Sequence, residues 1–128
     1  NSVERFPERQ ALAFVGEEYI LYKEFLDKVT KLSFHLISNG IKFGDKVAIW
    51  GENSPNWLMS YFAIVSIGAV AVPILPDFSP KEVENIMEHS DAKVLFVSAG
   101  LYKKLYMDGA AIGKTIILLR DFTMHINK

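Results

Sequence analysis

Apolar residues recur at helical spacing in the first third of the chain. The stretch "YKEFLDKVTKLSFHLISNG", residues 22–40, places an apolar residue on each turn and ends at Gly40, a common helix terminator. The apolar positions are Tyr22, Phe25, Leu26, Val29, Leu32, Leu36 and Ile37. This spacing predicts a long amphipathic helix with one buried stripe. Before it, "ALAFVGEEYIL", residues 11–21, has the pattern of two short strands around Gly16 and predicts a β-hairpin.

Four short apolar runs further along the chain predict β-strands. They are "KVAIW" (46–50), "AVAVPI" (69–74), "KVLFV" (93–97) and "TIILL" (115–119). The helices predicted between them span residues 55–68, 80–89 and 101–107. The first of these helices has Ser54 as its N-cap and Pro55 at its first position. The second opens with a capping box formed by Ser79 and Glu82.

The alternation of helices and strands predicts a parallel sheet with helices on its faces. Strands that are buried on both sides appear as continuous apolar runs, as these do. No internal repeat or low-complexity linker interrupts the pattern. We therefore predict a single α/β domain over residues 1–128, a three-layer α/β/α architecture whose mostly parallel sheet is preceded by a short N-terminal hairpin.

The run "WLMSYFAIVSIGAVAVPIL", residues 57–75, contains no charged residue and is long enough to cross a bilayer. Gly68 and Pro73 interrupt it, and Val70 and Val72 favour a strand over a helix. We therefore predict a buried helix that leads directly into a central strand, without a transmembrane span. A peripheral membrane or assembly domain that uses this segment is the alternative.

The charge balance bears on the class of partner. Lys and Arg number 14 against 15 Asp and Glu, a formal net charge of −1, whereas nucleic-acid-binding proteins usually carry a basic excess. The chain has no cysteine, which excludes disulfides, thiol chemistry and cysteine-ligated zinc. We expect no nucleic-acid partner and a cytoplasmic location, with peripheral attachment to a membrane as the alternative.

Motifs for catalysis and for nucleotide phosphates are absent from the sequence. The loop "GENSP" after the first predicted strand has one glycine, where a dinucleotide-binding fingerprint needs three. The Gly-Lys-Ser/Thr phosphate loop and the Gly-x-Ser-x-Gly motif are also missing. His35, His89 and His125 have no second metal ligand at suitable spacing. Taken alone, these residues leave open a free-standing flavodoxin-like module for nucleotide binding or protein interaction.

Segments in a fixed order resemble one enzyme family. "RFPERQALAF" resembles the family's entry segment, and "YKEFLDKVTKLSFHLISNGIKFGDKVAIWGENSPNW" its first helix, turn and strand. "AIVSIGAVAVPILPDFSPKEVENIMEHSDAKVLFV" resembles the helix–strand–helix–strand unit that follows. The chain is similar to the N-terminal part of an AMP-forming acyl-CoA synthetase of the adenylate-forming superfamily. Leu21 departs from the family, which commonly has Thr or Ser there, so the usual N-cap of the first helix is lost.

The resemblance implies a parent enzyme that activates a carboxylic acid with ATP and Mg²⁺ to an acyl-adenylate and then transfers the acyl group to CoA. Fatty acids are the favoured substrates, because the sequence resembles long-chain ligases more than amino-acid adenylation domains. The family's Ser/Thr/Gly-rich phosphate loop and catalytic lysine lie downstream of the matched region. We therefore expect a fragment of a larger adenylate-forming domain, inactive and without a cofactor of its own, whose partner is the remainder of its parent chain.

The resemblance also implies one edge of a CoA site. In acetyl-CoA synthetases the equivalent of "ILPDFSPKEV" begins with a loop beside the adenine end of CoA, and a basic residue further on contacts a CoA phosphate. By position, these are Leu75, Pro76 and Asp77 for the loop and Lys103 for the basic residue. That subfamily has glycines where this chain has Pro76 and Asp77, and Asp77 would repel phosphate. The competing interpretation is an ordinary strand–helix loop and a solvated lysine pair, Lys103 and Lys104.

The last predicted strand, "TIILL", has no predicted neighbour on its outer side. An unpaired strand edge is a template for pairing with another chain. We therefore predict that the fragment self-associates or is marginally stable because of this edge.

Overall fold

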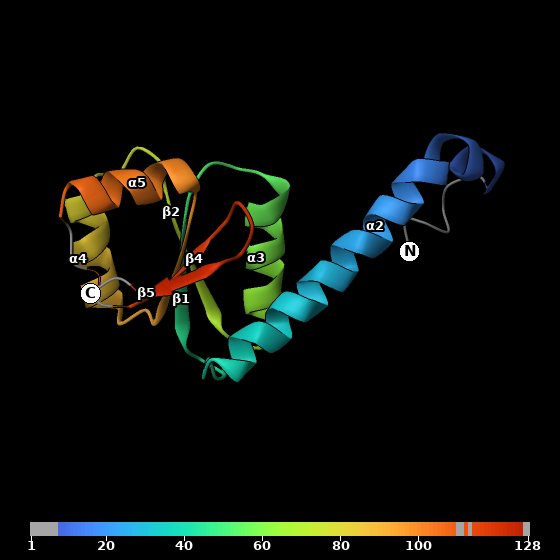
Figure 1. Cartoon of the computed structure of the whole chain (residues 1–128). Helices are drawn as coiled ribbons and strands as arrows, with labels where there is room; N and C mark the ends of the chain where they lie inside the picture. Colours follow the sequence, from blue (N-terminus) through green and yellow to red (C-terminus); the bar gives the residue numbers. More distant parts are fainter. Residues whose placement is uncertain (1–7, 110–111, 113, 127–128) are drawn as a thin grey trace.

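Helices and strands alternate along the chain, as the apolar runs predict (Figure 1). The computed structural model describes residues 8–109, 112 and 114–126 of the 128, with side chains at 22–109, 112 and 114–125. The helices are α2 (Glu8–Ser38), α3 (Pro55–Ser66), α4 (Pro80–Ser90) and α5 (Ala99–Met107). The strands are β1 (Lys46–Trp50), β2 (Val70–Ile74), β3 (Val94–Val97), β4 (Thr115–Leu118) and β5 (Met124–Ile126). The four predicted strands, and the helices predicted between them, are confirmed with small shifts at their ends.

The strands form one sheet in the order β2-β1-β3-β4-β5. β1 pairs in parallel on both sides, so that Ile49 lies opposite Pro73 of β2 and Phe96 of β3. β3 and β4 are also parallel, whereas β5 is antiparallel to β4. The prediction of a mostly parallel sheet is confirmed.

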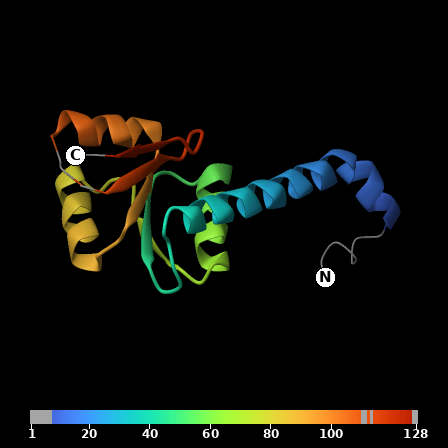
Figure 2. The ribbon, with the colours of Figure 1, turned by 60° about the horizontal axis from the view of Figure 1, so that its bottom comes forward.

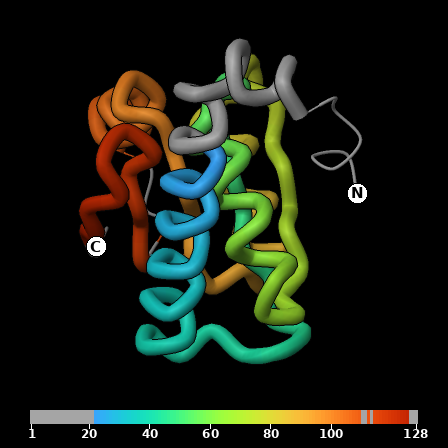
Figure 3. Tube along the Cα trace, turned by 90° about the vertical axis from the view of Figure 1, so that its right-hand side faces the viewer, coloured from blue at the N-terminus to red at the C-terminus, as the bar shows by residue number. Residues whose placement is uncertain are grey.

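Two buried clusters cover the two faces of the sheet. Alternate residues of β1 belong to different clusters: Val47 and Ile49 share one with residues of α2 and α3, whereas Ala48 and Trp50 share the other with residues of α4 and α5. Figures 1 and 2 show the same division, with α4 and α5 on one side of the sheet and α3 on the other. In Figure 3, α2 and α3 lie side by side. The three-layer α/β/α architecture is therefore confirmed.

The uncharged run over residues 57–75 divides into a helix and a strand, as predicted. Ser54 caps α3, because its Oγ accepts a hydrogen bond from the Trp57 N–H at 3.1 Å. Gly68 follows the helix with a φ of +81°, and a Cβ atom there would collide with the Phe43 ring. Within the described part of the chain, no helix combines the length and apolar character that crossing a membrane requires.

β2 is an edge strand, and the prediction that it is central in the sheet is wrong. Among the described strands it pairs with β1 alone. Pro73 gives the physical reason, because a proline has no N–H to donate to a second neighbouring strand. Val70 and Pro73 are accordingly exposed.

The hairpin predicted at residues 11–21 is wrong, because the backbone there is helical and continuous with the rest of α2. Residues that favour helices, including Glu, Arg, Gln, Ala and Leu, fill much of the segment that starts at Glu8. Gly16 alone costs a helix about 1 kcal/mol, which is too little to end it. Leu21 therefore lies inside a helix, where no N-cap is needed.

The edge of β4 is covered, contrary to the prediction for "TIILL". β5 pairs with it in antiparallel fashion, with Thr115 opposite Ile126. Asp121 holds the connecting turn, because its Oδ1 accepts hydrogen bonds from the N–H and the Oγ1 hydroxyl of Thr123. The sequence pattern did not indicate β5 because three residues are too few to show a period of two. Self-association through an open β4 edge therefore loses its structural basis.

Candidate functional site

The carboxyl ends of the parallel strands share one edge of the sheet, and the direction in which the chain adds strands reverses between β1 and β3. The chain passes from β1 through α3 to β2, but from β3 through α5 to β4 on the opposite side. Parallel sheets bind ligands in the crevice that such a reversal leaves. A cavity of about 380 Å³ lies here, at the ends of β1, β3 and β4. Its lining consists of Glu52, Ser54, Pro55, Asn56, Ser98, Ala99, Leu119 and Arg120. We call it the switch-point cavity.

Gly51 allows the three strand ends to approach one another beside the switch-point cavity. A Cβ atom at this position would lie 2.8 Å from Leu119 Cδ1 and 3.4 Å from Ser98 Cβ. The backbone pairing also continues past the strands, since the Ser98 N–H donates to the Trp50 carbonyl at 3.2 Å. A larger residue at Gly51 would therefore require the Leu119 side chain to move.

Asn56 closes one wall of the switch-point cavity. From the first turn of α3, its Nδ2 donates to the carbonyl oxygens of Leu119 at 2.5 Å and Arg120 at 3.2 Å. These bonds tie the helix to the turn between β4 and β5. Sequence reasoning did not single out Asn56, because its partners lie more than 60 positions away and no local motif marks the contact.

Two helix N-termini contribute to the same cavity. Pro55 begins α3 and Ala99 begins α5. Ser54 caps α3, but Ser98 makes no side-chain capping bond to α5. Unsatisfied N–H groups at a helix start favour anionic or polar groups. The lining thus offers polar contacts but no side chains paired as nucleophile and base.

The charges around the switch-point cavity nearly cancel. Glu52 and Arg120 are its charged lining residues, and Arg120 Nε lies 3.5 Å from Oδ2 of Asp121. Hydrogen bonds from the side chain and backbone of Thr123, and then the charge of Arg120, lower the pKa of Asp121. No cluster of three or more His, Cys, Asp or Glu residues suited to a metal ion occurs in the described ranges.

The residues predicted to contact CoA lie at the same edge of the sheet but outside the switch-point cavity. Leu75, Pro76 and Asp77 follow the carboxyl end of β2, and Leu75 and Asp77 are exposed. The Leu75 carbonyl accepts a hydrogen bond from Trp50 Nε1 at 3.1 Å, which fixes the start of the loop to the core. Lys103 is exposed on α5, about one turn after the helix begins.

The loop and Lys103 do not contact each other directly, and each follows a different strand of the sheet. The order β2-β1-β3 places two strand spacings, about 10 Å, between the end of β2 and the end of β3, where α5 begins. Phe78, just after the loop, and Tyr102, beside Lys103, both pack against the buried cluster that contains Trp50. The two parts therefore flank one side of the sheet. Their role in CoA binding stays a prediction.

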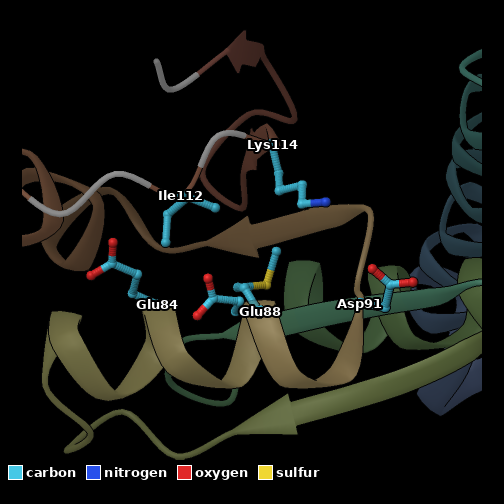
Figure 4. A pocket seen from close by; sticks show the side chains of 6 residues that line it. Glu84, Glu88, Asp91, Ile112 and Lys114 are labelled. Atoms are coloured by element: carbon cyan, nitrogen blue, oxygen red, sulfur yellow. The ribbon is translucent and has the colours of Figure 1, made fainter.

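A second groove, of about 250 Å³, lies between α4 and the residues just before β4 (Figure 4). Figure 4 shows Glu84 and Glu88 on α4, with Lys114 on the opposite wall. Glu84 is already paired with Lys81 at 3.4 Å. Because Lys114 directly precedes β4, this groove lies toward the amino ends of the strands, away from the edge where parallel sheets bind ligands. It has the character of a solvated acidic helix face.

The fold and the switch-point cavity define a class of protein: an α/β domain with a mostly parallel sheet and a cavity at the carboxyl ends of its strands, where such sheets bind ligands. A family model described as "AMP-binding enzyme" matches residues 1–123 of the chain. The chain belongs to this family.

Relatives within the family are ligases that act on different acids. The mitochondrial medium-chain acyl-CoA ligase ACSF2 of Danio rerio is 34% identical over 84 residues, which are 65% of this chain and 14% of that protein. The 4-hydroxybutyrate–CoA ligase 2 of Metallosphaera sedula is 33% identical over 116 residues, 91% of this chain and 21% of that protein. The crystal structure of the anthranilate CoA ligase AuaEII with anthranoyl-AMP aligns with a TM-score of 0.68 and 25% identity, over 76% of this chain and 19% of that one.

The chain thus spans 14% and 21% of the lengths of these two curated relatives. The resemblance to the N-terminal part of an AMP-forming acyl-CoA synthetase is confirmed. The fold class is confirmed as well, with the corrections to the hairpin, β2 and β5 described above.

Proposed function

We propose that this chain is the N-terminal part of an ATP-dependent, AMP-forming ligase that joins a carboxylic acid to CoA. The acid carboxylate displaces pyrophosphate from ATP·Mg²⁺ to give an acyl-adenylate, and the CoA thiol then displaces AMP to give the thioester. The match to the AMP-binding enzyme family over residues 1–123 is the observation that carries this proposal. A fatty acid is the proposed substrate, supported by the similarity to the medium-chain acyl-CoA ligase.

Within that enzyme, the 128 residues supply scaffold and one edge of the CoA site, and the reacting groups come from elsewhere in a larger adenylate-forming domain. Lys103 offers an exposed ammonium to a CoA phosphate, and the loop of Leu75, Pro76 and Asp77 lies beside the adenine. The chain alone is proposed to be inactive and to hold no ATP or Mg²⁺. This is supported by the lining of the switch-point cavity, which has neither a phosphate-binding loop nor a catalytic pair.

The CoA edge can be tested on the chain itself by NMR. Titration of the ¹⁵N-labelled chain with CoA should shift amide signals of residues 75–77 and of the turn around Lys103. The dissociation constant should be about 1 mM or weaker, because one wall of a site makes few contacts. Lys103→Glu should weaken this binding by about tenfold, since it removes a charged partner of phosphate.

Lys104→Glu is the matched control for Lys103→Glu, because the two lysines are adjacent and both exposed to solvent. It changes the net charge in the same way, so a general electrostatic effect would weaken CoA binding equally in both variants. Equal effects, or signal changes confined to other parts of the chain, would contradict the proposed CoA edge.

Calorimetry with ATP, AMP and FMN tests the competing interpretation, a free-standing flavodoxin-like module. The proposal expects no measurable heat with these nucleotides. Micromolar binding of one of them by the 128-residue chain would favour the module instead.

A test of the acid specificity requires a polypeptide that continues past residue 128 in the same reading frame. We expect acid-dependent release of pyrophosphate from ATP, fastest with fatty acids and slower with 4-hydroxybutyrate or anthranilate. A preference for an aromatic acid would contradict the fatty-acid proposal while leaving the ligase class intact. We propose a cytoplasmic location for the enzyme, which imaging of the tagged full reading frame would test.

A further inference from the structure

The helix layer formed by α2 and α3 carries apolar side chains on its outer side that no described segment covers. Six of them are between 41% and 53% exposed. They are Tyr22, Leu26 and Ile37 of α2 and Leu58, Phe62 and Val65 of α3. We call this set the α2/α3 face.

The α2/α3 face is continuous because the two helices pack side by side (Figure 3). The Phe25 and Phe62 rings meet edge to face with centroids 6.1 Å apart, and the Ser33 and Ser66 hydroxyls are 2.9 Å apart. The three exposed apolar residues of α3 are spaced at i, i+4 and i+7, which places them on one stripe. Contiguous exposed apolar surface of this kind marks a place where another surface packs.

α3 differs from an ordinary surface helix because it has no charged residue. Its inner side, with Met59, Ala63 and Ile64, is buried against the sheet. A surface helix normally places charged or polar residues opposite such a side, and a helix that is apolar all round is normally buried. The composition of α3 therefore indicates that its outer side is covered too.

The helix layer on the other side of the sheet has the opposite character. Lys81, Glu82 and Glu88 are exposed on α4, and Lys103 and Lys104 are exposed on α5. The large exposed apolar residues of this layer are confined to the end of α5. Among the described residues, the sheet therefore has one outer helix layer suited to water and one suited to a further layer of protein.

We propose that the part of the parent polypeptide that follows residue 128 packs on the α2/α3 face, so that α2 and α3 form an interior layer of the larger domain. This inference rests on the proposed function, because it takes the chain to be the N-terminal part of a longer ligase. It adds to that proposal the surface through which the two parts of the polypeptide meet.

The length of the relatives supports the rest of the same polypeptide as the cover. The chain spans 14% of the medium-chain acyl-CoA ligase and 21% of the 4-hydroxybutyrate–CoA ligase 2, so most of each relative lies outside the matched region. A segment on the same polypeptide meets the α2/α3 face at an effective concentration on the order of 1 mM, far above that of a free partner. A separate protein or a second copy would have to compete with this attached segment.

The chemistry of the α2/α3 face specifies the surface that covers it. Over the stripe on α3 that surface must be apolar, because burying a charge opposite Leu58, Phe62 and Val65 would leave it without a partner. The Asp27–Lys31 ion pair, at 3.1 Å and exposed on α2, can stay at the solvated rim of the contact. The expected cover is therefore apolar in its centre and polar toward the side of α2.

Thiol labelling of a polypeptide that continues past residue 128 tests the contact at α2. Leu26→Cys places a thiol in the α2/α3 face, and Glu24→Cys places one two positions earlier on α2, outside the face; both residues are exposed in the 128-residue chain. In the longer polypeptide, Leu26→Cys should be labelled several-fold more slowly relative to Glu24→Cys than in the 128-residue chain. Mass spectrometry of the peptide that carries each thiol measures the rates.

A charge in the α2/α3 face gives a second measurement on the longer polypeptide. Leu58→Lys would bury an unpaired charge beneath the cover and should lower the midpoint of thermal unfolding by about 5 °C or more. Asn85→Lys is the matched control, because it adds the same charge at an exposed position of α4 and should leave the midpoint nearly unchanged. Equal midpoints of the two variants would overturn the proposal.

The labelling result separates this inference from the ligase itself. Equal relative labelling of Leu26→Cys in the two polypeptides would overturn the cover, even if the longer polypeptide releases pyrophosphate in an acid-dependent reaction. Slower labelling in a polypeptide that releases none would support the cover and contradict the ligase. Protection of Leu26→Cys that develops only as the protein concentration rises would identify a second copy as the cover and overturn the proposal.

Discussion

α3 and α4 begin with the same signal but have opposite outer sides. Each has a Ser N-cap followed by Pro, each is 11 or 12 residues long, and each buries one side against the sheet. α4 turns charged residues outward, among them Lys81 and, in the groove of Figure 4, Glu88. α3 turns Leu58, Phe62 and Val65 outward and has no charge. The cap thus determines where a helix begins but not whether its outer side is charged.

The largest expected effect comes from the inner side of α3. Ile64 is fully buried, so Ile64→Ala should lower the free energy of unfolding by about 2–5 kcal/mol through lost apolar contact and a residual cavity. Val65→Ala, at the next position, changes a side chain that is 41% exposed and should cost less than about 1 kcal/mol. Urea denaturation at low micromolar concentration measures both. Equal losses would mean that the two sides of α3 are buried alike in the monomer.

Variants at the residues that end α3 and α4 should give the next largest changes in stability, and the two changes should have opposite signs. Gly68 follows α3 at a φ of +81°, so Gly68→Ala should destabilise by about 1–2 kcal/mol, and its collision with Phe43 adds to this. Asp91 ends α4 at a φ of +61°, a conformation that glycine adopts without cost. Asp91→Gly should therefore raise the midpoint of thermal unfolding slightly. Loss of stability on Asp91→Gly would show that its side chain has a role beyond ending the helix.

Removing the N-caps of α3 and α4 should change stability by less than these variants do. Ser79 and Glu82 form two reciprocal hydrogen bonds, at 3.2 Å and 2.7 Å, whereas Ser54 accepts one at 3.1 Å. Ser79→Ala should cost about 1 kcal/mol, and Ser54→Ala the same or less. Chemical denaturation of the two variants, with Ser79→Asp and Ser54→Asp as capping controls, compares them. A greater loss at Ser54 would mean that the capping box contributes little to α4.

The smallest effect concerns Asp45, in the loop before β1. A hydrogen bond from the Lys42 backbone N–H, and then the hydrogen bond and charge of Lys93, lower the pKa of Asp45 below 3.8. A lowered folded-state pKa contributes stability that is present above the unfolded pKa and is lost as the pH falls through the folded value. Between about pH 5 and about pH 2, the chain should therefore lose slightly more stability than Asp45→Asn does. Parallel pH profiles of the urea midpoint would contradict this role, with Asp77→Asn as the exposed control.

The core of the fold could be predicted from the sequence because its signals are local. Continuous apolar runs indicated β1, β3 and β4, and Ser-Pro pairs indicated the starts of α3 and α4. The errors arose where the outcome depends on distant residues. β2 became an edge strand because β3 pairs with the other side of β1 and not with β2. The backbone at 11–21 followed the adjacent helix, although its own pattern indicated strands.

The candidate site was less predictable than the fold. The resemblance supplied Leu75, Pro76, Asp77 and Lys103, and the structure places them near the carboxyl ends of the strands without bringing them into one cavity. The switch-point cavity depends on Asn56 reaching two carbonyl groups of the β4–β5 turn. Such a contact exists only once β1, β3 and β4 have assembled, and no spacing in the sequence reveals it.

The outer side of α3 can be examined most directly by thiol labelling at matched positions on α3 and α4. Val65→Cys places a thiol on the outer side of α3, and Glu88→Cys places one on the exposed side of α4, in a chain without other cysteines. If the remainder of a larger domain covers the outer side of α3, labelling of Val65→Cys should be several-fold slower in a polypeptide that continues past residue 128 than in the 128-residue chain, and labelling of Glu88→Cys should be the same in both. Equal labelling of Val65→Cys in the two polypeptides would contradict the account.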